Sequence, residues 1–327
     1  LAIALNTGKV PVSLAQLRSE FGLTLVQAGW VSSMLTTVAV FSAAFVGMWV
    51  GRVGATRMVL GGLLLCAAAS LATLASTGPL ALLLFRLAEG AGFMVVAVAC
   101  PALVSAAAGP ADRRFALALW STYMPAGASV AMAFAPSLLP LAGWRGLWAL
   151  TAALLALAAL AVWRERERYR VPPAPALTGS GSFFGPVRQA LGRPLPWVLA
   201  LSFGVWATQH FALIVWLPTF LKEQRGLVAD TVALLTGLML VACVPGNLLG
   251  GTLVQRGVPR WRLLAAAQAL CGLMAVGYSS DALPDALRYA LTVGVSFTGG
   301  LMPAAIMASS TVLARTPQQI GTLQGLY

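Results

Sequence analysis

Acidic residues, histidine and cysteine are scarce in this 327-residue chain, which has nine Asp and Glu residues, one histidine and four cysteines. The cysteines lack zinc or redox spacing. A His-Glu-x-x-His zinc motif, a Gly-x-Ser-x-Gly nucleophile elbow and a Walker phosphate loop are all absent from the sequence. A single histidine also leaves little for acid–base catalysis. We therefore expect no catalytic residues, no metal site and no cofactor.

Apolar residues are abundant instead, at 59% of the chain against 9% charged residues, far outside the range of soluble globular domains. A membrane-spanning helix needs roughly 20 apolar residues, and continuous runs of that kind exclude a closed β-barrel. The sequence predicts an all-α integral membrane protein, with a partial span at its start and another beginning at Ile320. The predicted complete spans are Leu25–Val46, Met58–Ala75, Leu80–Ala108, Phe115–Leu139, Leu147–Trp163, Trp197–Leu221, Val232–Val254, Leu263–Tyr278 and Leu287–Leu313.

Fourteen of the 21 Lys and Arg residues lie in every second gap between these spans. Positively charged short loops stay on the cytoplasmic side. This pattern predicts that the loops after helices 2, 4, 6, 8 and 10 are cytoplasmic, in a multi-pass protein of the inner (plasma) membrane. The net charge of +12 then indicates anionic lipids as partners. Nucleic acid is excluded, because no basic domain lies outside the predicted spans.

A polar segment divides the chain in the middle. Alternating Arg and Glu from Arg164 are followed by Pro172, Pro173 and Pro175 and by a Gly/Ser stretch, a composition typical of a flexible linker. We expect an N-terminal half at 1–163, a cytoplasmic linker at 164–195 and a C-terminal half at 196–327.

The two halves share a loop pattern of glycines and arginines, repeated at an offset of 204 residues. These loops are predicted to act in gating, through Gly47, Arg52, Gly54 and Arg57 in the first copy and Gly251, Arg256 and Arg260 in the second. The offset implies six plus six helices, so we expect about 10–11 of 12 to be present, with helix 1 incomplete and the chain ending early in helix 11.

These motifs resemble those of the major facilitator superfamily over the whole chain. The resemblance rests on both loops, on Arg86-Leu-Ala-Glu89-Gly90 and on Gly143-Trp144-Arg145. Short segments at Ala99–Leu103, Trp120–Gly127 and Trp216–Pro218 are similar to the cyanate-transporter-like branch. Two positions depart from the family pattern, because Gly51 replaces a usual Asp and Phe134-Ala-Pro136 replaces the glycine-rich run of proton-coupled drug exporters. The resemblance implies alternating access, with helices 1, 4, 7 and 10 lining a central cavity.

Ionisable residues inside a membrane are costly and mark functional sites by default. Arg86 and Glu89 lie one turn apart on the same helix face. In one interpretation Arg86 binds an anion and Glu89 tunes it or carries a proton. In the other, the two side chains neutralise each other and only fix the packing of the helix. Asn6 and Lys9 lie one turn apart on helix 1. Lys9 either lines the cavity or extends to the membrane interface.

Uncharged residues complete the predicted solute site, each with plain packing as the alternative. Helix 7 offers Gln209 and the lone His210, and aromatic walls are predicted from Trp120, Tyr123 and Trp206. Phe297 and Thr298 precede Gly299 and Gly300, where helix 10 is expected to be flexible or broken. Asn247, beside Pro245, either contacts solute or satisfies freed backbone groups.

These features predict a monomeric secondary transporter of a small solute. The two positive charges of Lys9 and Arg86 exceed the one negative charge of Glu89. This excess favours a small anion such as cyanate or a carboxylate as the solute, with proton coupling through Glu89 or His210. Efflux of hydrophobic or cationic compounds is the alternative. An intramembrane enzyme and a non-transporting receptor are the alternatives of a different class.

Overall fold

Helices form every regular element of the computed structural model, which describes residues 1–109, 112–167, 192–313 and 323. The first group begins with a short 3-10 helix, η1 (Ala2–Ala4). It continues with α1 (Leu5–Phe21), α2 (Leu25–Val53), α3 (Ala55–Thr73), α4 (Pro79–Ala107), α5 (Arg113–Ser121) and α6 (Tyr123–Arg164). The second group comprises α8 (Pro194–Glu223), α9 (Ala229–Gln255), α10 (Arg260–Ser279) and α11 (Asp285–Leu313). Most of the predicted linker, including residues 168–191, lies outside the described residues. So does Ile320, where the partial membrane span at the end of the chain is predicted to begin, after α11.

The helices begin and end where local signals favour it. Thr24 caps α2 in a reciprocal capping box with Gln27, and Pro79 and Pro194 occupy the first turns of α4 and α8. Gly22 ends α1 in the left-handed conformation, at φ 61°. The predicted helical runs are therefore confirmed, apart from the region between 113 and 164.

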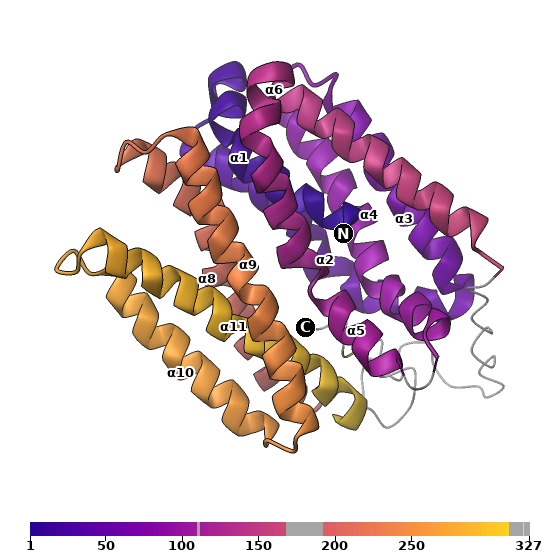
Figure 1. Cartoon of the computed structure of the whole chain (residues 1–327). Helices are drawn as coiled ribbons and strands as arrows, with labels where there is room; N and C mark the ends of the chain where they lie inside the picture. The colour runs from indigo at the N-terminus through magenta and orange to yellow at the C-terminus, as the bar shows by residue number, and fades with distance from the viewer. Residues whose placement is uncertain (110–111, 168–191, 314–322, 324–327) are drawn as a thin grey trace.

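That region departs from the prediction of one span over Phe115–Leu139. The chain breaks at Thr122, which separates α5 from α6. A second break follows at Gly143, whose φ of 61° and ψ of −170° interrupt α6. Figure 1 shows the two parts of α6 running in opposite directions on either side of this reversal. The span predicted to end at Leu139 and the span predicted to begin at Leu147 are therefore separate helical segments, as expected. Only the break at Thr122 was not predicted.

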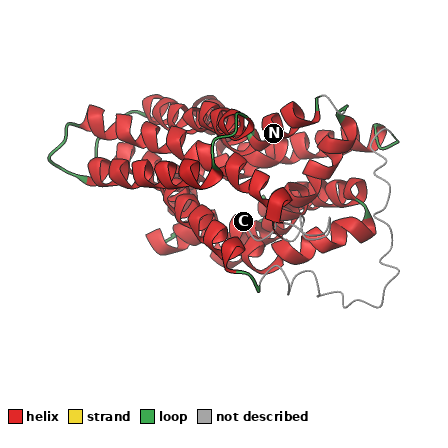
Figure 2. Cartoon of the chain, turned by 90° about the horizontal axis from the view of Figure 1, so that it is seen from below, coloured by secondary structure: helices red, strands yellow, loops and turns green. Residues whose placement is uncertain are grey.

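Two groups of helices lie side by side (Figure 1). In the first group, α4 contacts α2 and α3, and α6 contacts α1 and α3. In the second, α11 contacts α9 and α10. The main junction between the groups is formed by α6 and α9, and α1 also contacts α8. Viewed from below in Figure 2, the described chain consists of helices and connecting loops.

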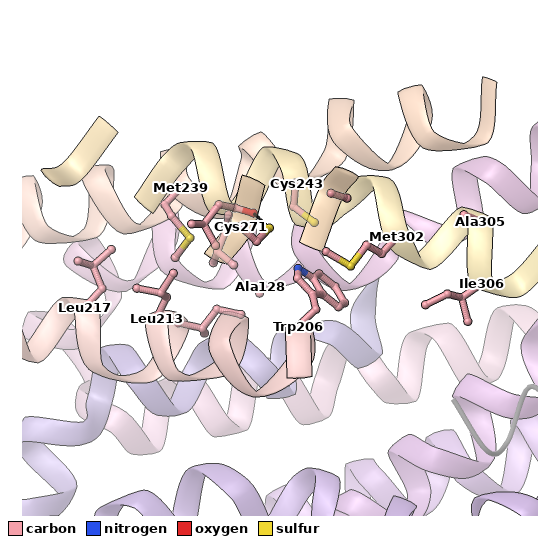
Figure 3. Packing of buried hydrophobic residues seen from close by; sticks show 14 of the residues in the cluster. Ala128, Trp206, Leu213, Leu217, Met239, Cys243, Cys271, Met302, Ala305 and Ile306 are labelled. Atoms are coloured by element: carbon pink, nitrogen blue, oxygen red, sulfur yellow. Dashed lines mark hydrogen bonds between the residues drawn. The ribbon is translucent and has the colours of Figure 1, made fainter. Parts of the chain in front are cut away.

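The hydrophobic core of the second group crosses this junction. Buried side chains from α8 to α11 pack together with Ala128 and Met132 of α6. Figure 3 shows Trp206 of α8 reaching towards Cys243 of α9 and Met302 of α11. The two groups therefore share an apolar seam.

Large apolar side chains also cover the outside of the bundle. Leu201 is 66% exposed, and Leu273 and Val276 are each 71% exposed. Seven of the described helices are long and apolar enough to cross a membrane. Lipid tails are the environment that such a surface fits, so the chain is a multi-pass membrane protein.

Candidate functional site

Three charged side chains meet inside the first group of helices. The Lys9 ammonium of α1 lies 2.7 Å from Oε1 of Glu89 on α4, and Nη1 of Arg86 pairs with Oε2 of the same carboxylate. Lys9, Arg86 and Glu89 are 0%, 1% and 0% exposed. The predicted pairing of Arg86 with Glu89 is present, and Lys9 points into the bundle rather than to the interface. We call these three residues the charge cluster.

Helices α3 and α6 complete the surroundings of the charge cluster. The Ser70 hydroxyl of α3 donates to Oε1 of Glu89 at 2.5 Å and accepts from Lys9 Nζ at 2.9 Å. The Lys9 ammonium also lies 4.6 Å from the ring centroid of Trp148 on α6, a cation–π distance. Sequence reasoning missed Ser70 and Trp148, because a lone serine or tryptophan in an apolar run carries no signal of its partner.

Arg86 is held by two backbone groups in addition to Glu89. Its Nε donates to the carbonyl of Val31 on α2 at 3.2 Å, and its Nη2 donates to the carbonyl of Asn6 on α1 at 3.3 Å. The Asn6 amide donates to the carbonyl of Ile3 in η1, while Asn6 Oδ1 and Thr7 Oγ1 are buried without a hydrogen-bond partner. Unpaired hydrogen-bonding groups are therefore buried in the same turn of α1 whose Asn6 carbonyl binds Arg86.

The second group contributes uncharged polar groups. Trp206 and His210 of α8 stack, with ring centroids 5.2 Å apart, and both are buried. Trp206 Nε1, His210 Nδ1 and Ser296 Oγ of α11 are buried without a partner. Gln209, beside them in sequence, is half-buried. Buried polar atoms are normally hydrogen-bonded, so these atoms are suited to take a ligand group or a partner from another conformation.

The predicted aromatic wall is divided into two pairs. Trp120 and Tyr123 stack across the break at Thr122, with centroids 5.1 Å apart, whereas Trp206 stacks on His210. Asn247 of α9 donates to the carbonyl of Ser121 at 2.8 Å. It therefore satisfies a backbone group next to the break and joins the two groups of helices.

Helix α11 is continuous through Phe297 and Thr298, so the helix is not broken there, and its flexibility stays a prediction. The neighbouring glycines allow close packing instead. A Cβ atom at Gly299 would lie 1.8 Å from Trp206 Nε1, and one at Gly300 would lie 2.4 Å from the Cys243 carbonyl. Phe297 is 37% exposed and Thr298 is buried.

The two predicted gating loops share a backbone feature. Gly54 lies between α2 and α3 at φ 94°, and Gly257 lies between α9 and α10 at φ 85°. Such values favour glycine. The close helix approach is made by Gly250, where a Cβ atom would lie 2.4 Å from the Leu301 carbonyl, rather than by Gly251.

The arginines of these loops differ in exposure. Arg57 and Arg256 are exposed, and Arg260 is half-buried. The side chains at Gly47 and Arg52 are not among those that the structure describes. The predicted gating role of these residues therefore stays a prediction.

A second charged network lies at the α1–α2 end of the bundle. Glu20 accepts from Arg145 Nη2 at 2.6 Å and from Trp144 Nε1 at 2.7 Å. The hydrogen bond from Arg145, followed by that from Trp144, lowers the pKa of this exposed carboxyl. Nearby, Arg18 of α1 pairs with Glu223 of α8 at 3.1 Å, which joins the two groups of helices.

Known proteins resemble the chain in sequence along most of its length. A family model described as Major Facilitator Superfamily matches residues 1–327. The 3-(3-hydroxy-phenyl)propionate transporter of Escherichia coli (strain K12) is 26% identical over 297 residues, covering 88% of this chain and 71% of that protein. A probable sulfoacetate transporter of Cupriavidus necator is 25% identical over 264 residues, covering 76% of this chain and 60% of its own length.

Solved structures agree in fold. A bacterial homolog of the human lysosomal transporter Spinster, inward-facing and unoccupied, matches with a TM-score of 0.75 at 17% identity. That match covers 100% of this chain and 76% of that one. The occupied form matches with a TM-score of 0.73 at 16% identity, covering 99% and 76%.

Proposed function

Because the chain belongs to the Major Facilitator Superfamily, we propose that it is a secondary transporter that moves a small organic anion by alternating access. Family membership and the two transporter relatives indicate transport of a small solute, and the chain is not an enzyme. We further propose that it works as a monomer in the inner membrane, with its arginine-rich loops on the cytoplasmic side.

The charge cluster is the observation that carries this proposal. Two buried cations, Lys9 and Arg86, share the one carboxylate of Glu89. Burying charge is costly unless it is paired, so one positive charge in excess favours an anion as the further ligand. A cationic solute would meet two cations and a carboxylate whose two oxygens are already occupied. The cluster therefore supports anion transport over efflux of cations.

The names of the relatives support the same substrate class. Hydroxyphenylpropionate and sulfoacetate, for which the two relatives are named, are both organic anions at neutral pH, the first with one negative charge and the second with two. An organic anion is thus favoured over cyanate, and the likeness to the cyanate-transporter-like branch stays a prediction.

Alternating access requires the two groups of helices to part at one end at a time, and we propose that they act as the halves 1–163 and 196–327. Two cross-junction contacts would have to break in turn. The Arg18–Glu223 pair lies at the α1–α2 end, where its side chains are 29% and 55% exposed. The Asn247–Ser121 hydrogen bond lies further towards the opposite end of α9.

The charge count supports the further proposal that transport is coupled to protons through Glu89. Protonation of Glu89 would leave Lys9 and Arg86 without their shared counterion, and an anion bound at the same place would restore it. Proton and anion binding are therefore expected to favour one another. His210 is stacked on Trp206 and separate from this cluster, so we assign the proton to Glu89.

Uptake into proteoliposomes tests the proposal. An inwardly directed proton gradient should drive uptake of labelled 3-(3-hydroxyphenyl)propionate, and Arg86→Ala should abolish it. Arg166→Ala is the matched control, because Arg166 lies in the exposed turn after α6 and is 48% exposed. Uptake of lipophilic cations that is insensitive to Arg86→Ala would refute the proposal.

A further inference from the structure

The charge cluster contains an odd number of charges. Lys9 and Arg86 contribute two positive charges and Glu89 contributes one negative charge, which leaves an excess of one. The other charged side chains in the described ranges lie at helix ends, in turns or beside the Gly143 reversal. A solute that reaches the cluster therefore meets a local charge of plus one.

We infer that this site selects solutes by their charge and takes monovalent organic anions, an inference that rests on the proposed function. One negative charge brings the cluster to neutrality. A second would leave a buried negative charge with no partner, which a low-dielectric interior penalises heavily. Divalent anions, sulfoacetate among them, would bind with comparable affinity only when Glu89 is protonated or replaced, so the selection applies to the state in which Glu89 is ionised.

The hydrogen bonds of the cluster identify the group that makes the contact. A guanidinium has five N–H donors, and Arg86 uses three of them, on Val31, Glu89 and Asn6. The two that remain match the two oxygens of one carboxylate. Lys9, in contrast, is enclosed by Glu89, Ser70 and the Trp148 ring. Arg86 therefore contacts the solute, while Lys9 sets the total charge.

Calorimetric binding to the purified protein at neutral pH tests this with three probes of the same skeleton. They are 3-phenylpropionate, its para-carbamoyl derivative and its para-carboxyl derivative. The last two are nearly equal in size and differ by one charge. The monovalent carbamoyl compound should bind about tenfold or more tightly than the divalent carboxyl compound.

Two variants change the charge of the cluster in opposite directions. Glu89→Gln raises it to plus two, so the preference should reverse towards the divalent probe. Lys9→Gln lowers it to zero, so all three probes should bind at least about tenfold more weakly. Size-exclusion chromatography and thermal unfolding check that each variant is folded. If neither variant folds, the wild-type comparison alone decides.

The outcomes separate this inference from the proposed function. Equal binding of the carbamoyl and carboxyl probes by the wild-type protein would overturn selection by charge while leaving anion transport intact. Binding of none of the three probes, together with binding of lipophilic cations, would overturn both.

Discussion

Replacement of Arg86 by lysine isolates the geometry of the guanidinium from its charge. The side chain is 1% exposed and joins three helices through Val31, Asn6 and Glu89. A lysine keeps one ammonium near Glu89 but reaches neither of the two backbone carbonyls. Hydrogen bonds to charged groups contribute about 1.5–3 kcal/mol each. The two carbonyls lie in helices and keep their backbone donors, so the lower end of that range applies to each.

The expected loss of unfolding free energy in Arg86→Lys is therefore about 3 kcal/mol, from two lost hydrogen bonds. Titration with a denaturing detergent in mixed micelles measures it, with Arg166→Lys as the control, which should change by less than about 0.5 kcal/mol. Uptake of a monovalent anion should fall as well, because the paired donors are lost. Wild-type stability together with wild-type uptake in Arg86→Lys would refute this reasoning.

Three further predictions concern stability. Ser70→Ala should lower the free energy of unfolding by about 1.5–3 kcal/mol, because it removes a hydrogen bond to a buried carboxylate. Thr73→Ala, whose hydroxyl bonds only its own helix, should cost less in the same titration. Gly246→Ala should cost about 1–3 kcal/mol or more, because its Cβ would lie 1.9 Å from a carbonyl oxygen of α11. Gly237→Ala on the same helix has open space and should be neutral or stabilising, so equal effects would refute the packing argument. The lowered pKa of Glu20 stabilises the folded state above the ordinary carboxyl pKa and ceases to do so as pH falls through the lowered value. The stability difference between wild type and Glu20→Gln, under about 1 kcal/mol for this exposed pair, should therefore begin to shrink as the pH falls below about 4.3 and vanish once the pH is below the lowered pKa, and a constant difference would contradict the assignment.

The helices could be predicted from sequence because a membrane leaves the backbone few alternatives. Long apolar runs, capped by Thr24 or opened by Pro79 and Pro194, gave bounds close to those observed. The break at Thr122 could not be predicted in this way, because neither glycine nor proline occupies that position.

The charge cluster was predictable only in part. Arg86 and Glu89 are three residues apart, so helical periodicity alone brings them to one face. The contacts of Glu89 with Lys9, 80 residues away, and with Ser70 of α3 depend on how three helices pack. Periodicity within one helix contains no information on such pairs.

The sequence alone could not tell whether a glycine in a helix marks flexibility or close packing against a neighbouring helix. Gly299 and Gly300 suggested a weak point in the helix, yet α11 runs through both without a break. Their role is set by what lies opposite, namely Trp206 and the Cys243 carbonyl. Close approach and flexibility favour the same residue, and only the neighbouring helix distinguishes them.

Anion binding at Arg86 is tested most directly by thermal unfolding of the purified protein with small organic anions and, separately, with lipophilic cations. A ligand that binds only the folded state stabilises it by about 2.7 kcal/mol at a hundredfold excess over its dissociation constant. We expect stabilisation by monovalent organic anions in the wild-type protein and in Arg166→Ala, and none in Arg86→Ala. Stabilisation by lipophilic cations instead, lost in Glu89→Gln, would contradict anion transport and favour efflux.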